Sequence, residues 1–319
     1  MSLLPVEPAH RLTARAEEQR WLVTALWSEQ AVGIIGGEPK CCKSFLALDL
    51  AVSVAAGTPC LRRFPVPRPG RVLLYAAEDA HHIVRQRLEG ICSAAGLALA
   101  DLDVQVITAP TVRLDIEIDR KALDATIAKL APRLLVLDPF VRLHRVDENA
   151  SGEVAPLLAY LRELQRRHGL AVILVHHAKK GAGRARAGQA LRGSSEFHAW
   201  GDSNLYLRRN GDPHEGGNLT LTVEHRAAAP IPPLTLELTQ RVNALALEVI
   251  QQHIQPTPPH RSVDELISAA LSDADHPVPF AELRGVCRVR TASLYARLAA
   301  LTAAGHVVKS DQGYRLTAR

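Results

Sequence analysis

The sequence has few aromatic residues, a single methionine and no long uninterrupted run of apolar residues. Because aromatic side chains make up only 4% of the chain, little material is available for stacking nucleobases, which argues against a stacking-type single-strand binder. An apolar run of about 18 residues, the length that a membrane span needs, is absent. Residues 1–20 lack the apolar centre of a secretory signal. We therefore expect a cytoplasmic protein with no membrane partner.

Cysteine is also scarce, and the five thiols form no recognisable pattern. Their number is odd, and only Cys41 and Cys42 are close in sequence, which excludes a disulfide framework and a C-x-x-C metal knuckle. We expect all of them to be reduced. The net charge of +5 permits a polyanionic partner without requiring one, so the position of the charges matters more than their sum.

Short apolar runs alternate with segments of helical periodicity between residues 32 and 223, which predicts an α/β fold with a mostly parallel sheet. The expected buried strands are Val32–Ile35, Arg71–Ala76, Val104–Ile107, Arg133–Asp138 and Ala171–Val175. The expected helices are Lys43–Ala56, His81–Ala95, Arg120–Leu130 and Gly152–His168. Two runs with cleaner alternation, Leu219–His225 and Leu234–Leu238, predict a hairpin at one edge of the sheet.

A polar, proline-rich stretch over residues 255–262 interrupts this pattern and indicates a linker. The expected organisation is therefore an N-terminal segment (1–30), a large α/β domain (31–254), the linker and a small domain (263–319). The small domain offers three helices, Val263–Ser272, Phe280–Val286 and Thr291–Ala304, and then a hairpin-like ending. This is the order of elements in a winged helix-turn-helix domain.

The segment Gly37 to Ser44, GEPKCCKS, follows an expected strand and opens an expected helix, which is the context that a Walker A motif requires. In such a loop, backbone N–H groups hold phosphates, Lys43 reaches the β and γ phosphates, and Ser44 binds Mg²⁺. Cys42 occupies the second glycine position, where a Cβ can crowd the backbone or disfavour a positive φ. The alternative is a chance match in a strand, turn and helix. The residues expected to bind ATP are Gly37, Glu38, Pro39, Lys40, Cys41, Cys42, Lys43, Ser44 and Phe45.

Further polar residues lie at expected strand ends. Asp138 ends the run LLVLD and suits a second Mg²⁺ ligand, with a plain strand-terminating aspartate as the alternative. Glu78 follows the second strand, where a general base for water is expected. His176 and His177 end the run AVILV, where a side chain can sense the γ-phosphate. We expect Glu78, Lys43, Asp138 and His177 to be catalytic, with ATP and Mg²⁺ as cofactors.

In this order the motifs resemble the RepA-like branch of the RecA-fold ATPases, whose type member is a hexameric plasmid replicative helicase. The resemblance covers residues 32–209 and rests on the Walker A loop, YAAEDA, VLDPFVRLH, DENASG, VHHAKKG and LRGSS. It implies a RecA-like ATPase domain, ATP bound between subunits of a homo-oligomeric, hexamer-like ring, Glu78 as base and His177 as sensor. An alignment anchored on RGSS puts Asp202 at the arginine finger, with Arg208 and Arg209 just downstream as finger candidates.

Two basic segments are expected to contact DNA. Residues 178–194 contain no acidic residue and suit phosphate contacts, with a solvated surface loop as the alternative. The second segment holds arginines in or just before the last helix of the small domain, with a protein-docking module as the alternative. The DNA-binding candidates are Lys179, Lys180, Arg184, Arg186, Arg192, Arg288, Arg290 and Arg297.

Two functions remain in competition. The first is a DNA-associated ATPase that forms a helicase-like ring and serves the replication or mobility of a genetic element. The second is an ATP-gated DNA-binding regulator or recruitment factor that does not translocate. A degenerate scaffold is a third reading, and the intact Lys43, Ser44 and Asp138 weigh against it.

Overall fold

The computed structural model describes residues 4, 6–12, 20–177, 196–210, 217–241, 244–250, 263–272, 274, 276–287 and 291–317, with only the backbone at 241 and 244. The chain divides into two compact units, Met1–Gln251 and Gln252–Arg319. Within the described ranges, no helix is both long and apolar enough to cross a bilayer.

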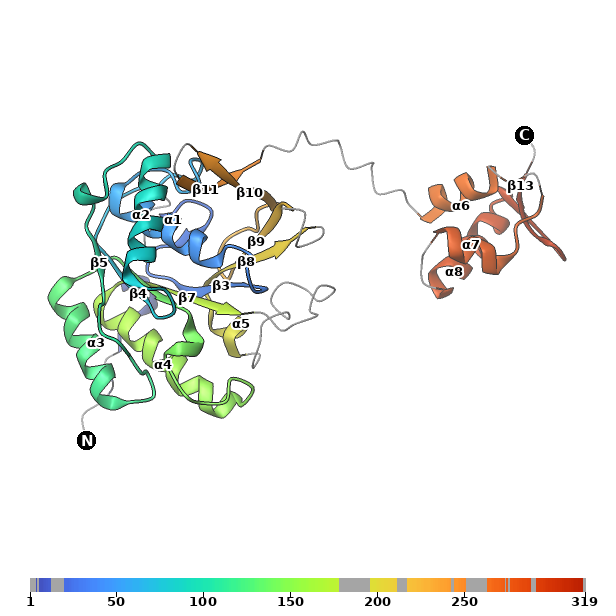
Figure 1. The fold of residues 1–319 in the computed structure, drawn as a ribbon. Coiled ribbons are helices and arrows are strands. Elements are labelled where there is room, and N and C mark those ends of the chain that lie inside the picture. Colours follow the sequence, from blue (N-terminus) through green and yellow to red (C-terminus); the bar gives the residue numbers. More distant parts are fainter. Residues whose placement is uncertain are drawn as a thin grey trace. The chain divides into compact units, whose positions relative to one another are not determined.

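A nine-stranded sheet forms the centre of the first unit, in the order β11-β10-β9-β8-β3-β7-β6-β4-β5 (Figure 1). The strands from β8 to β5 are parallel, and β9, β10 and β11 continue the sheet in antiparallel fashion. The bounds are β3 (Val32–Gly37), β4 (Val72–Ala76), β5 (Val104–Val106), β6 (Leu134–Asp138), β7 (Ala171–His177), β8 (Ser203–Arg209), β9 (Leu219–His225), β10 (Leu234–Arg241) and β11 (Ala244–Val249). The mostly parallel sheet that the apolar runs predict is confirmed.

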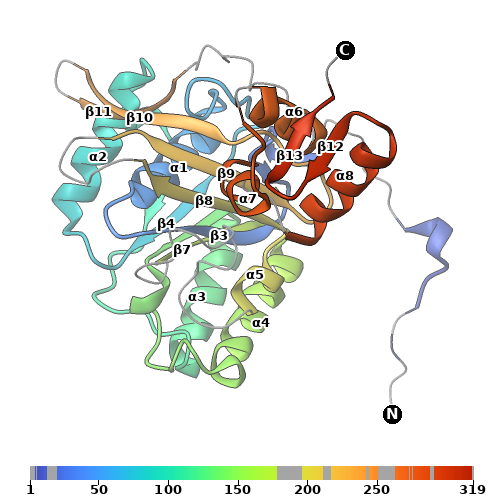
Figure 2. The same cartoon turned by 90° about the vertical axis from the view of Figure 1, so that its right-hand side faces the viewer.

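Helices cover both faces of this sheet (Figures 1 and 2). On one face lie α1 (Lys43–Ala56) and α2 (His81–Ala94), and on the other lie α3 (Glu117–Leu130), α4 (Ser151–His168) and the short α5 (Glu196–Trp200). Successive strand residues such as Ile34 and Ile35 enter opposite cores, which is why the strands are apolar throughout. The result is the expected α/β, RecA-like core.

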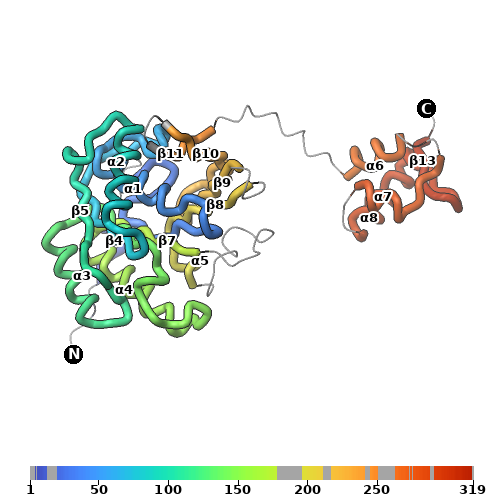
Figure 3. Tube along the Cα trace, in the orientation of Figure 1, coloured from blue at the N-terminus to red at the C-terminus, as the bar shows by residue number. Residues whose placement is uncertain are grey.

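The crossover helices return the chain to the same side each time, so the carboxyl ends of all the parallel strands meet at one edge (Figure 3). We call this side of the sheet the carboxyl edge and the opposite side the amino edge. The residues that follow β3, β4, β6 and β7 are therefore brought together, although they are far apart in the sequence.

Three parts of this unit differ from the sequence-based expectation. β8 inserts between β3 and β9, and β11 adds the outermost strand, so the predicted β9–β10 hairpin lies one strand in from the edge. Residues before 31 also enter the core, because β1 (Trp21–Val23) and β2 (Trp27–Ser28) bury Leu22 and Trp27 completely. Trp27 covers Gly33, where an added Cβ would lie 1.7 Å from the carbonyl oxygen of Ser203. The close approach of β3 and β8 thus requires glycine at position 33.

The second unit contains α6 (Val263–Ser272), α7 (Phe280–Cys287), α8 (Thr291–Ala303) and the hairpin β12 (Val307–Ser310) and β13 (Gly313–Leu316). Its own core includes Ile267, Leu283, Leu294, Leu298 and Tyr314. Three helices followed by a hairpin is the order of elements expected for a winged helix-turn-helix domain.

Candidate nucleotide site

The Walker A loop connects β3 to α1 and passes close to β8. A Cβ on Gly37 would lie 2.3 Å from the carbonyl oxygen of Leu207 and 2.7 Å from the sulfur of Cys41, so only glycine fits there. The helix begins directly at Lys43. Its first N–H groups have no partner within the helix and are available to an anion at this end.

Cys42 has a left-handed backbone, with φ of 63° and ψ of 25°. An L-residue in this conformation costs roughly 1–2 kcal/mol relative to a right-handed one, because its Cβ approaches the following carbonyl. The backbone at position 42 therefore has the left-handed conformation that glycine adopts at the least cost, although a cysteine occupies the position.

Lys43 is held inside this loop, with 5% of its surface exposed. Its ammonium group donates a hydrogen bond of 2.7 Å to the carbonyl oxygen of Glu38 and lies 3.8 Å from the sulfur of Cys41. Burial lowers the pKa of Lys43, while nearby acidic groups such as Asp138 oppose that change. A phosphate at the helix end would supply the negative charge that this buried ammonium group needs.

Strand register brings the other predicted residues to the same place. Asp138 is paired in register with Ala76, two residues before Glu78, and His177 is paired with Gly37. Together they surround a pocket of about 260 Å³. Its lining residues are Lys40, Cys41, Cys42, Lys43, Ser44, Phe45, Glu78, Arg87, Asp138, Val175 and His177.

Asp138 and Ser44 form the part of the pocket that suits Mg²⁺. Asp138 is 8% exposed, and burial raises its pKa from 3.8 to about 6, against the opposing effects of a hydrogen bond with Ser44 and the charge of Lys43. A buried carboxylate whose charge is disfavoured is a good partner for a cation, and Mg²⁺ commonly takes one or two protein ligands together with substrate phosphates. Within the described residues, no cluster of three or more metal-binding side chains forms a separate metal site.

Two arginines at the pocket were not predicted from the sequence. Arg87, on α2, lines the pocket, forms an ion pair with Asp79 and lies over the ring of Phe45. Arg142, just after β6, donates a hydrogen bond of 2.9 Å to Glu78. The contact with Glu78 joins residues 64 positions apart, so no local sequence pattern reveals it.

The two predicted sensor histidines face opposite sides of the sheet. His177 lines the pocket, as expected. His176 is 1% exposed and stacks on Phe197 in the other core, with ring centroids 4.3 Å apart. The prediction of His176 as a second sensor is thus corrected to a core position, since adjacent strand residues alternate in direction.

The arginine-finger prediction is also revised. Arg209 donates hydrogen bonds to the carbonyl oxygens of Lys40 and Gly217, at 2.8 and 3.2 Å, so it braces the Walker A loop of its own chain. Arg208 is exposed at the pocket end of β8, and its role as an arginine finger stays a prediction.

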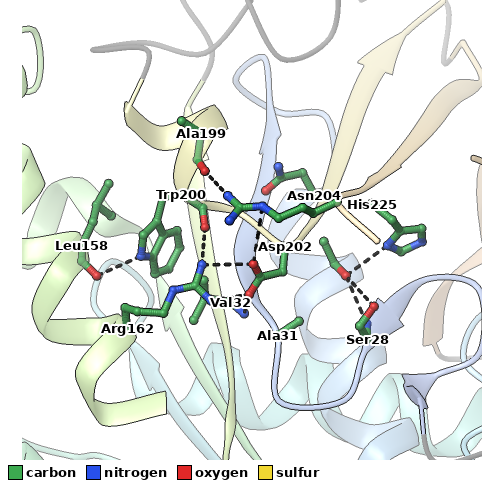
Figure 4. A network of polar contacts seen from close by, with 12 residues as sticks. Ser28, Ala31, Val32, Leu158, Arg162, Ala199, Trp200, Asp202, Asn204 and His225 are labelled. Atoms are coloured by element: carbon green, nitrogen blue, oxygen red, sulfur yellow. Dashed lines mark hydrogen bonds and ion pairs between the residues drawn. The ribbon is translucent and has the colours of Figure 1, made fainter. Parts of the chain in front are cut away.

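Asp202, the position aligned with the finger, lies just before β8, at the amino edge and far along the strand from the pocket. It accepts hydrogen bonds from Arg162 and from the backbone N–H of Val32 (Figure 4). Its role is therefore structural.

Most of the predicted DNA contacts lie outside the described residues: Lys179, Lys180, Arg184, Arg186, Arg192, Arg288 and Arg290. Arg297 is described, and it pairs with Asp264 of α6, with a distance of 2.7 Å between Nε and Oδ1. This ion pair links α8 to α6, and the contact of Arg297 with DNA stays a prediction. The neighbouring surface of α8 contributes Tyr295, which is 62% exposed, to a groove beside the hairpin.

A comparison with protein families gives one finding. A family model described as an AAA domain matches residues 2–183, a span that includes the Walker A loop, Glu78, Asp138 and His177. The match identifies the broad class of ATPase and does not distinguish the RepA-like branch within it. It ends before β8 and the finger candidates.

Proposed function

Because the chain belongs to the AAA-domain family of P-loop ATPases, we propose that it is a Mg²⁺-dependent ATP hydrolase that works on DNA as a ring-forming, helicase-like motor. The observation that carries the proposal is the convergence of Lys43, Ser44, Glu78, Asp138 and His177 on one pocket. These residues come from four separate strand ends, and each has the chemistry that one part of phosphoryl transfer requires.

In this proposal each side chain has a defined task. Lys43 and the first N–H groups of α1 hold the phosphates, and Ser44 and Asp138 hold the metal ion. Bound Mg²⁺ stabilises the negative charge that develops on the phosphate oxygens. Glu78 accepts a proton from the attacking water, and His177 contacts the γ-phosphate from the end of β7.

Action on DNA and assembly into a ring are supported by different features. The segment of residues 178–194 has basic residues without any acidic one, and it follows His177 directly. Arg208 stands at the pocket end of β8, while Arg209 is engaged with its own loop. In a ring, Arg208 of a neighbouring copy would reach this site. The proposed setting of the motor is the replication or mobility of a genetic element.

A second function is an ATP-gated DNA-binding regulator or recruitment factor that does not translocate. Cys42 at the second glycine position favours it, because strain in the phosphate-binding loop is more compatible with a switch than with repeated turnover. The second unit, with helices and hairpin in winged-helix order, would choose the site on DNA.

Steady-state ATP hydrolysis by the purified full chain, alone and with single- or double-stranded DNA, tests the proposal. Lys43→Ala is the control for contaminating ATPase. Turnover that depends on Lys43 and rises with DNA supports the motor. Tight ATP binding with no turnover under either condition would contradict it and favour the ATP-gated regulator.

A further inference from the structure

Arg142 holds the carboxylate that is proposed to act as general base. Its Nε lies 2.9 Å from Oε1 of Glu78. Glu78 is part of the pocket wall, whereas Arg142 is absent from the lining and approaches from outside it. Arg142 ends the short turn η4 (Phe140–Arg142), which begins two residues after Asp138.

This contact opposes the task of a base. To take a proton from water, a carboxylate needs a free oxygen directed at that water. A charge-assisted hydrogen bond from a guanidinium group occupies one oxygen of Glu78 and fixes the direction of the carboxylate, so that oxygen is not available to the attacking water. We propose that Arg142 is a positioning residue that restrains Glu78 in the absence of nucleotide, and that efficient hydrolysis requires release of this contact. The inference rests on the proposed ATP hydrolysis.

The strength of the contact suits a restraint that can be released. The side chain of Arg142 is 62% exposed and that of Glu78 is 42% exposed. Ion pairs in such surroundings are weak, so breaking this one changes an equilibrium by up to about fivefold. A restraint of that size slows basal turnover without blocking it.

The turn η4, which carries Arg142, packs against residues of β7 and α5. Phe140 is completely buried, edge-on to Phe197 at 5.4 Å between centroids and 6.1 Å from His176. His176 directly precedes the pocket residue His177, and Phe197 lies in α5. A shift of β7 or α5 would therefore move Phe140 and with it η4. Binding of nucleotide beside His177 could change the position of Arg142 in this way.

The test compares single variants of the full chain in ATPase assays without DNA. We expect R142Q to raise kcat two- to fivefold and to leave KM for ATP unchanged, because phosphate and metal contacts are retained. R142K, which keeps the charge but loses the Nε donor, should give a smaller increase. R85Q is the matched control, since Arg85 forms an exposed pair of the same type, 2.8 Å from Glu89 on α2. It should match the wild type.

DNA stimulation supplies a second measurement that general loosening of the fold would not produce. If DNA stimulates turnover by releasing Arg142 from Glu78, R142Q should already have the released rate without DNA. The ratio of DNA-stimulated to basal turnover should then fall in R142Q by the same factor as basal kcat rises. Unchanged or reduced basal kcat in R142Q would overturn the inference. If R142Q fails to fold, R142K replaces it: a raised basal kcat supports the inference, and an unchanged or reduced basal kcat overturns it.

Failure of the proposed function looks different. If neither the wild-type chain nor R142Q hydrolyses ATP in any condition, the proposed function is wrong, and the inference about Arg142 fails with it. A wild type that hydrolyses ATP while R142Q is slower would remove only the role of Arg142.

Discussion

The two edges of the parallel sheet place their charged residues in opposite environments. At the carboxyl edge, burial raises the pKa of Asp138 to about 6, and Cys42 is held in a left-handed conformation. At the amino edge, Asp202 accepts hydrogen bonds from Arg162 and from the backbone of Val32, and Arg162 also reaches the carbonyl of Trp200 (Figure 4). Folding therefore disfavours the charge of Asp138 at the carboxyl edge, whereas hydrogen bonds satisfy the charge of Asp202 at the amino edge.

This difference separates function from stability in physical terms. A pocket for a charged ligand must keep charged groups incompletely paired until the ligand arrives, and that arrangement lowers the stability of the empty fold. Groups that already hydrogen-bond to one another have no donor or acceptor available for a ligand, and their hydrogen bonds stabilise the fold. Substitutions at the two edges should therefore have effects of opposite sign.

The largest expected effect is on turnover at the carboxyl edge. Glu78→Gln removes the proposed base while keeping its size, so kcat should fall at least about 100-fold. ATP binding should stay within about twofold of the wild type, because the phosphate and metal residues are unchanged. Steady-state hydrolysis at saturating ATP and binding of a fluorescent ATP analogue measure the two quantities.

Glu89→Gln is the matched control for that variant, because Glu89 is an exposed glutamate on the neighbouring helix α2. It should hydrolyse ATP like the wild type. Turnover at the normal rate in Glu78→Gln would remove this residue from the mechanism and leave the pocket without its base.

The next effect tests the stability cost of Asp138. Its folded pKa is raised from 3.8, so the penalty for its charge develops as pH rises from about 4 to about 6 and is complete at pH 7. Asp138→Asn removes that charge. We expect the unfolding free energy at pH 7, without nucleotide, to rise by roughly 3 kcal/mol, and Mg²⁺-dependent turnover to be lost.

Denaturant unfolding at neutral and at acidic pH checks the sign of this effect. The gain should disappear near pH 4, where the wild-type carboxyl group is protonated in the folded chain. A variant that is less stable than the wild type at pH 7 would show that the surroundings of Asp138 stabilise its charge. The two edges would then not differ in how they treat a buried carboxylate.

Asp202→Asn tests the other edge with the same chemical change. It weakens the pairing with Arg162, which then lacks a carboxylate in a largely enclosed position, so stability should fall by roughly 2 kcal/mol. This corresponds to a decrease in melting temperature of about 4–8 °C. Lysine-dependent ATP turnover at low temperature should be unchanged, and a loss of turnover without a loss of stability would contradict a structural role.

The sequence predicts the carboxyl edge better than the amino edge for a physical reason. Val32–Ile35 and Ala171–Val175 are apolar because both sides of each strand are buried, and α1 begins at Lys43 because the Walker A loop sets its start. The sequence does not predict β8, because SNLYLRR mixes polar ends with an apolar centre. Its polar residues are explained only by partners distant in sequence, such as the contact of Asn204 with the backbone of Ile34.

Within the site, the residues that bind or react were predictable and those that position them were not. A Walker A lysine and a strand-end aspartate have local patterns that follow from their chemistry. The contact of Arg142 with Glu78 depends on how η4 and the end of β4 meet, and nothing in either segment alone specifies it. The separation of His176 from His177 follows from strand alternation once the strand is known to extend to residue 177.

The smallest expected effect comes from Cys42. In the left-handed conformation, glycine avoids a steric cost of roughly 1–2 kcal/mol but loses about 0.5–1 kcal/mol through its more flexible unfolded state. Cys42→Gly should therefore stabilise the empty chain by about 0–1.5 kcal/mol and tighten ATP binding by a small factor. Cys42→Ala keeps the Cβ and serves as the control, with stability close to the wild type. If both variants gain equally, the thiol rather than the backbone is the source of the strain. If neither gains, the left-handed backbone at position 42 is not a source of unfavourable energy at the carboxyl edge.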